Sequence, residues 1–153
     1  MRVILPGHLD KRIKTAFKRS FPLESCVFVI GRTKRGTIYE VRDIYVPGGQ
    51  EKYAKTDRIQ YQHSWWDEAR ALARDSKLQL LGDVHSHPYT AEFYPDATAG
   101  PSADDLKDYG YVRRKTGLKI PIMGICSVFP SKRGMEARLK FWSCVKHPAL
   151  IIT

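Results

Sequence analysis

The chain has 153 residues, of which 42% are hydrophobic, and this suits one compact domain over residues 1–153 rather than a disordered chain. No stretch reaches the roughly eighteen apolar residues of a membrane span, and the N-terminal apolar run is too short for a signal peptide, so we expect a cytoplasmic protein. The formal charge of +10 would suit a nucleic-acid binder, but the basic residues are scattered without an RNA-binding or zinc-finger motif, which instead indicates a basic surface that attracts an acidic partner.

Hydrophobic periodicity predicts helices where apolar residues recur every three or four positions and strands where they alternate or run together. In the first helix, Leu9, Ile13 and Phe17 are spaced by four, with basic residues between them. Ser64 is expected to cap the second helix. The predicted elements are, in chain order, a helix over 7–20, strands over 25–31 and 37–46, a helix over 64–77, a strand over 78–84, a helix that begins at 101–105, and strands over 120–129 and 136–145. In the helix that begins at 101–105, Leu106, Tyr109 and Val112 or Arg113 are expected to share a face.

This order of elements is typical of an α/β or α+β protein in which a mixed β-sheet is flanked by helices. Each of the three cysteines, Cys26, Cys126 and Cys144, lies in an apolar run that is typical of a strand. Their spacing contains no CxxC pair, so we expect free buried thiols in a reducing compartment and no cysteine zinc site.

Two histidines at the end of the strand over residues 78–84 are candidate metal ligands. His85 and His87 are two positions apart, and alternate side chains of a strand point to the same face, so both imidazoles can reach one ion. A third ligand has to come from elsewhere in the chain, and Asp105 lies in the first turn of the next predicted helix. Two histidines and one carboxylate form a catalytic zinc set with a fourth position open for water, and we expect one zinc ion per chain.

These residues belong to a larger pattern. A His-x-His pair or a Ser-x-x-Asp helix start is common by itself, whereas the two together, in this order, are rare. With Glu24, the segments His85-Ser86-His87-Pro88 and Ser102-Ala103-Asp104-Asp105 resemble the JAMM, or MPN-plus, zinc metallopeptidases, which carry a glutamate, His-(Ser or Thr)-His-Pro and Ser-x-x-Asp. The glutamate also follows a helix and a proline and precedes an apolar strand ending in glycine, as in the family.

The resemblance extends over nearly the whole chain and implies both a fold and a role for each matching residue. It implies an MPN/JAB architecture, which is cytidine-deaminase-like, with zinc held by the three candidate ligands. Glu24 matches the carboxylate that takes a proton from zinc-bound water and passes it to the leaving amine. Ser102 matches the residue that helps to stabilise the oxyanion. Asp104 competes with Asp105 for the ligand position, but the Ser-x-x-Asp spacing selects Asp105.

The chain departs from the family pattern in one place. Fourteen residues, 88–101, separate the second histidine from the serine, which is more than the family usually places there. Insertions of this size cost little stability and are compatible with the same ligand set. We predict that residues 89–100 gate or shape the cleft, and that Glu92 or Asp96 within them can occupy the open zinc position in a resting state.

Members of this family cleave after the C-terminal glycine of ubiquitin-like proteins or trim small sulfur-carrier proteins, and this short chain resembles their prokaryotic single-domain branch. The resemblance therefore implies a zinc-dependent peptidase or isopeptidase that acts on a Gly-Gly tail. Two alternatives stay open. One is a non-catalytic MPN scaffold, although such members typically lack the histidines or the glutamate. The other is a RadC-like nucleic-acid-associated protein, although those relatives carry His-Asn-His-Pro-Ser-Gly.

Overall fold

The computed structural model describes residues 1–88, 100–144 and 148–151. Its elements are, in chain order, β1 (Arg2–Ile4), α1 (Gly7–Ser20), β2 (Cys26–Lys34), β3 (Ile38–Tyr45), the short 3-10 helix η1 (Gln50–Lys52), α2 (His63–Asp75), β4 (Gln79–Pro88), α4 (Ala103–Thr116), β5 (Ile122–Ser131), β6 (Gly134–Cys144) and β7 (Pro148–Ile151).

Within the described ranges, the strands form one seven-stranded sheet in the order β1-β3-β2-β4-β5-β6-β7. Strand β1 pairs with β3, and β4 with β5, in parallel, whereas the other neighbouring strands are antiparallel. Strand β4 therefore lies at the centre of the sheet, between β2 and β5. The predicted fold class, a mixed sheet flanked by helices, is confirmed.

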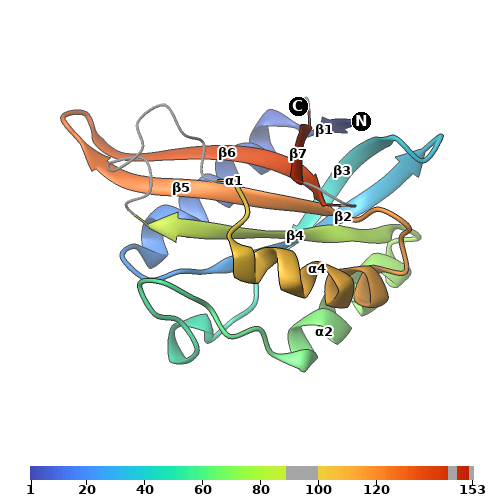
Figure 1. Cartoon of the computed structure of the whole chain (residues 1–153), viewed down its shortest axis with the longest axis horizontal. Coiled ribbons are helices and arrows are strands. Elements are labelled where there is room, and N and C mark those ends of the chain that lie inside the picture. Colours follow the sequence, from blue (N-terminus) through green and yellow to red (C-terminus); the bar gives the residue numbers. More distant parts are fainter. Residues whose placement is uncertain (89–99, 145–147, 152–153) are drawn as a thin grey trace.

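Helices cover both faces of the sheet, with α1 on one face and α2 and α4 on the other (Figure 1). The side chains of β2 alternate between two cores, because Val27 and Val29 pack with α1, whereas Phe28 and Ile30 pack with α2. The predicted apolar stripe of α1 is buried. On β4, Val84 belongs to the α1 core, so the side chains on either side of it in the strand point toward α2 and α4.

All eight predicted elements are present, with ends that differ by a few residues, and the structure adds η1 and the edge strands β1 and β7. The predicted cap at Ser64 is wrong. Helix α2 begins one residue earlier, with Gln62 as its N-cap residue and no capping side chain in this described segment, so Ser64 lies inside the first turn. Along the helix predicted to begin at 101–105, Tyr109 and Val112 are buried, whereas Leu106 is 37% exposed.

Two of the three cysteines can be compared with the prediction of free buried thiols. Cys26 and Cys126 are free and buried, as predicted, and the side chain of Cys144 lies outside the described part of the structure. Burial raises the pKa of both thiols, that of Cys126 to about 12. In the described ranges, none of the helices is long and apolar enough to cross a membrane.

Candidate metal centre

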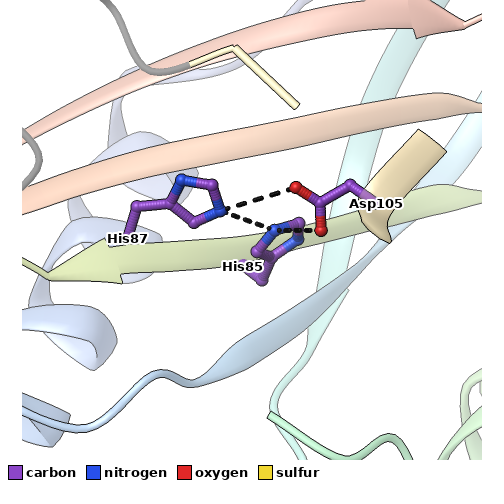
Figure 2. A group of neighbouring side chains, drawn as sticks. All are labelled: His85, His87 and Asp105. Carbon is purple, nitrogen blue, oxygen red and sulfur yellow. Dashed lines mark hydrogen bonds and ion pairs between the residues drawn. The ribbon is translucent and has the colours of Figure 1, made fainter. Parts of the chain in front are cut away.

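A pair of imidazoles at the end of β4 forms the centre of the site. His85 and His87 alternate with Ser86 along the strand, so both point to the same face of the sheet, as predicted, and both approach Asp105 (Figure 2). Their Nε2 atoms lie 3.0 Å apart, and the ring planes are inclined by 50°. His85 is buried and His87 is half-buried. The two rings therefore direct a nitrogen atom each to one shared point.

The first turn of α4 brings a carboxylate to the same point. Ser102 is the N-cap residue: its Oγ accepts a hydrogen bond from the Asp105 amide (3.1 Å), and its own amide donates to Asp105 Oδ2 (2.6 Å). This reciprocal capping box fixes the Asp105 carboxylate, whose Oδ1 lies 3.1 Å from His85 Nε2 and whose Oδ2 lies 3.6 Å from His87 Nε2. Asp104 points to solvent, so the structure selects Asp105, as the spacing does.

The donor set fits a tetrahedral zinc ion. Bonds from zinc to nitrogen or oxygen of about 2.0–2.1 Å, at tetrahedral angles, place neighbouring ligand atoms about 3.3–3.4 Å apart. In the cluster the two Nε2 atoms lie 3.0 Å apart, and the nearest Asp105 oxygen is 3.1 Å from His85 (Oδ1) and 3.6 Å from His87 (Oδ2), which is close to this spacing. Among the residues that the structure describes, this is the one group of His, Cys, Asp and Glu side chains that could hold a metal ion. The three predicted ligands are thus brought together in a form that zinc prefers.

The carboxylates around His85 decide which groups are charged before a metal binds. Burial acts to lower the pKa of His85, but its contact with the Asp105 carboxylate and the negative charges of Asp105 and Asp83 outweigh burial and raise the pKa to about 10. Burial acts to raise the pKa of Asp105, but hydrogen bonds from His85 and His87 hold it well below its usual range. A metal ion that binds here has to displace a proton from His85, so binding is coupled to proton release.

The segment before β2 is tied to β4 so that Glu24 reaches the same cleft. Cys26 lies directly opposite His85 in the sheet, and Glu24, two residues earlier, lies toward the same face. The Ser25 amide donates to Ser86 Oγ, and the Ser86 amide donates to the Ser25 carbonyl oxygen, each over 2.9 Å. The middle serine of the His-Ser-His motif therefore fixes the start of β2 beside the two histidines.

A cleft of about 820 Å³ connects these groups. It is lined by the three ligands, by Glu24, by residues 53 and 55–61, and by the start of α4. Glu24 itself is buried. Burial raises the pKa of Glu24 to about 7, opposed by His85 and supported by the negative charge of Asp105. A carboxyl group with this pKa can take up and release a proton near neutral pH.

Three residues that support the site were not predicted from the sequence. Ser86 joins β4 to β2, Asp83 places a buried carboxylate beside His85, and Tyr61 donates a hydrogen bond to that carboxylate. Asp83 could have been found, because it is two positions before His85 and strand alternation puts it on the same face. Tyr61 could not, because it lies in a polar segment whose sequence has no clear periodicity.

Two predictions concern the lengthened loop, and both fall on residues outside the described ones. Glu92 and Asp96 were expected near the open zinc position, and residues 89–100 were expected to gate the cleft, whereas the structure leaves 89–99 undescribed. The oxyanion role of Ser102 stays a prediction. Its hydroxyl oxygen is placed at the edge of the cleft by the helix cap.

Comparisons with known proteins bear on the family and the fold of the chain. Residues 8–144 match the family model described as prokaryotic homologs of the JAB domain. The solution structure of protein DSY2949 from Desulfitobacterium hafniense has a TM-score of 0.67 at 16% identity, covering 98% of this chain and 90% of that chain. The solution structure of a protein from Salinibacter ruber has a TM-score of 0.57 at 23% identity, covering 99% and 90%. At these identities the likeness shows the fold alone. A comparison with curated proteins found no match.

Proposed function

The chain belongs to the family of prokaryotic homologs of the JAB domain, and from this premise we propose that it is a zinc-dependent peptidase or isopeptidase that cleaves after the Gly-Gly tail of a ubiquitin-like or sulfur-carrier protein. The observation that carries the proposal is the meeting of three zinc-type donors with a buried glutamate in one cleft. The ionised form of a buried carboxyl group is costly to desolvate, so its place beside the three donors favours a catalytic role over that of a scaffold.

In this proposal His85, His87 and Asp105 hold the ion. When bound there, zinc supplies a Lewis acid that makes water more acidic and polarises a carbonyl group. Glu24 carries the proton, because a carboxyl with a pKa of about 7 can accept it from the attacking water and return it to the leaving amine. Ser102 Oγ accepts a hydrogen bond from the Asp105 amide, so its hydroxyl proton can be donated to the developing oxyanion.

The position of the site favours an extended tail as the substrate. The ligands lie at the end of β4 and open into the cleft, where an extended peptide can align one carbonyl group beside them. Glycines before the scissile bond let that backbone approach closely, because they have no side chain to collide with the walls. The positive charge of the chain then favours a partner whose folded body is acidic.

The test is incubation with ubiquitin-like proteins that carry a C-terminal extension after Gly-Gly, with the products identified by mass spectrometry. We expect a cut directly after the second glycine, and a sharp loss of turnover when that glycine is replaced by a bulky residue. A double variant, His85→Ala with His87→Ala, should lose both zinc and activity, whereas His8→Ala, at an exposed position on α1, should keep both. Equal cleavage of tails without glycine would indicate a general peptidase, and full activity in the double variant would refute the metal site.

A further inference from the structure

A second buried carboxylate, Asp83, lies behind the proposed metal ligands. It precedes His85 by two residues on β4, so its side chain lies on the same face of the sheet. Only 3% of the residue is exposed. A carboxylate loses its hydration at such a place and needs partners in the protein to replace the water. The partners of Asp83 therefore indicate what this residue does.

The contacts of Asp83 run from Tyr61 to His85. The Tyr61 hydroxyl donates a hydrogen bond to Asp83 Oδ2 over 2.6 Å, and the same oxygen lies 3.7 Å from His85 Nδ1. In the described part of the chain, His85 is the one basic side chain within ion-pairing distance of Asp83. Two neighbouring buried atoms, Asp83 Oδ1 and His85 Nδ1, have no hydrogen-bond partner among the described residues. The oxygen of Asp83 that Tyr61 holds is thus also the one that lies nearest to the imidazole.

This arrangement matches what a metal ligand requires of His85. The ring can offer Nε2 to a metal ion only if the proton of the neutral imidazole is on Nδ1. In the structure Nε2 faces the other two ligands, and Nδ1 faces Asp83. An anionic acceptor beside Nδ1 favours that tautomer and holds the ring in the ligating orientation.

The 3.7 Å separation is longer than a hydrogen bond, but the surroundings allow it to close. A cavity of about 50 Å³ lies beside these atoms, with Tyr61, Asp83 and His85 in its lining. A small rotation of the imidazole or of the carboxylate within this space brings Nδ1 to the acceptor. Hydrogen bonds of this kind are often long before the ligand is bound.

We propose that Asp83 is a positioning residue for the ligand His85, and that Tyr61 holds Asp83 in place. Asp83 touches neither substrate nor metal in this proposal; it fixes the tautomer and orientation of the ring that does. The inference rests on the proposed metal centre and extends it to a second layer of residues.

The test compares zinc affinity, measured by competition with a chromophoric chelator, in three conservative variants. Asp83→Asn should raise the zinc dissociation constant by about 10–100-fold, the usual effect of losing such a partner. Tyr61→Phe should raise it by a smaller factor. The matched control is Tyr39→Phe, since Tyr39 is also buried and donates a hydrogen bond to Ile120, but belongs to the α1 core; it should leave zinc affinity unchanged.

A second readout separates positioning from a merely structural role. In the zinc-loaded chain, nitrogen-15 NMR should show His85 protonated on Nδ1, with the low-field proton of a hydrogen bond to a carboxylate, and this proton should move upfield in Asp83→Asn. Thermal unfolding of the chelated proteins should show that Asp83→Asn is still fully folded at the temperature of the zinc titration, so that partial unfolding does not account for the weaker binding.

Unchanged zinc affinity and an unchanged Nδ1 proton in Asp83→Asn would overturn the inference while leaving the metal centre intact. If Asp83→Asn does not fold, the wild-type spectrum decides, because a zinc-loaded His85 without a proton on Nδ1 contradicts the proposal. A wild-type chain that binds no zinc would overturn the metal centre itself, and the positioning role with it.

Discussion

The carboxyl group of Glu24 lies in the cleft, and only 8% of the residue is exposed. Its ionised form is poorly solvated there, and burial is the main reason why its pKa is raised to about 7. The same property serves the proposed reaction, because a group that is half ionised near neutral pH can both take and return a proton. Burial of Glu24 therefore favours proton transfer but lowers the stability of the folded chain when the carboxyl group is ionised.

The replacement Glu24→Gln separates zinc binding from proton transfer. Glu24 is not among the ligand atoms of the cluster, so the variant should keep its fold and one zinc per chain. Turnover should fall by at least about a hundredfold, the low end of general-base effects. Zinc content by mass spectrometry and rates on a cleaved Gly-Gly substrate check this. Near-normal turnover would mean that another residue is the base.

The same variant should change the pH dependence of stability in the chelated protein. The pKa of Glu24 rises from 4.5 in the unfolded chain to about 7 in the folded one, so the folded state favours the protonated carboxyl. Wild-type stability is therefore lost as the pH rises from about 4.5 through 7, whereas a glutamine stays neutral. Between pH 5 and pH 8, Glu24→Gln should therefore gain about 1–3 kcal/mol of stability relative to the wild type.

Urea unfolding of both chelated proteins at the two pH values measures this difference. Glu51→Gln, at an exposed position, controls for the general loss of one negative charge and should show no gain between pH 5 and pH 8. If the free energies of unfolding of Glu24→Gln and the wild type differed by the same amount at pH 5 and pH 8, burial would not raise the pKa of Glu24.

The roles of some single residues could be predicted from the sequence, and those of others could not. The pair His85 and His87 could be predicted from physical reasoning, because strand alternation alone places both rings on one face. Glu24 and Asp105 are distant from them in the chain, and resemblance to a family identified the role of the glutamate. Tyr61 left no signal, because its contact with Asp83 depends on the path of an irregular segment.

At the scale of elements, the site depends on how β2 and β4 are joined. The Ser25 amide has Ser86 Oγ as its acceptor, in a buried place where water cannot substitute. Ser86→Ala should leave that amide without a partner and lower the free energy of unfolding by about 1–3 kcal/mol. It should also reduce turnover, because the start of β2 carries Glu24 into the cleft.

Ser86→Thr is the matched control for this prediction, since threonine keeps the hydroxyl oxygen. It should restore most of the stability and most of the turnover. Urea unfolding and steady-state rates measure the two effects. If the alanine variant were as stable and as active as the wild type, the serine would not be what holds the two strands together.

The long elements were predictable and the short ones were not. Helix α1 was predicted with its observed bounds, because a four-residue spacing sustained over several turns is specific to a helix. Strands β1 and β7 have three and four residues, too few for alternation to be recognised. The cap of α2 was misplaced at Ser64, because side-chain preference identifies a suitable residue but not the turn at which the chain enters the helix.

At the scale of the whole molecule, charge is distributed unevenly around the site. Exposed basic residues of α1 lie on the face of the sheet away from the cleft, namely Lys11, Arg12, Lys18 and Arg19. Their field extends over about 8 Å at physiological salt and further at low salt. Their effect on an acidic partner is therefore on the rate of encounter.

We expect kcat/KM for a folded acidic substrate to fall steeply as sodium chloride is raised from 20 to 300 mM, with kcat nearly constant. A short uncharged peptide with the same Gly-Gly tail should show little dependence on salt. Stopped-flow or steady-state rates over this range check the expectation. If both substrates showed the same salt dependence, it would come from charges in the cleft and not from the overall charge of the chain.

Helix α4 is attached to the sheet by few apolar side chains, since Tyr109 and Val112 are its buried residues, and yet it delivers Asp105. An ion bound by ligands from both β4 and α4 would hold this helix against the sheet, and only for as long as the ion is bound. Amide hydrogen exchange should therefore speed up in α4 when zinc is chelated, while β2 and β5 remain protected. A frayed helix is also a better target for proteases, so the lifetime of the chain in a cell would follow the local supply of zinc.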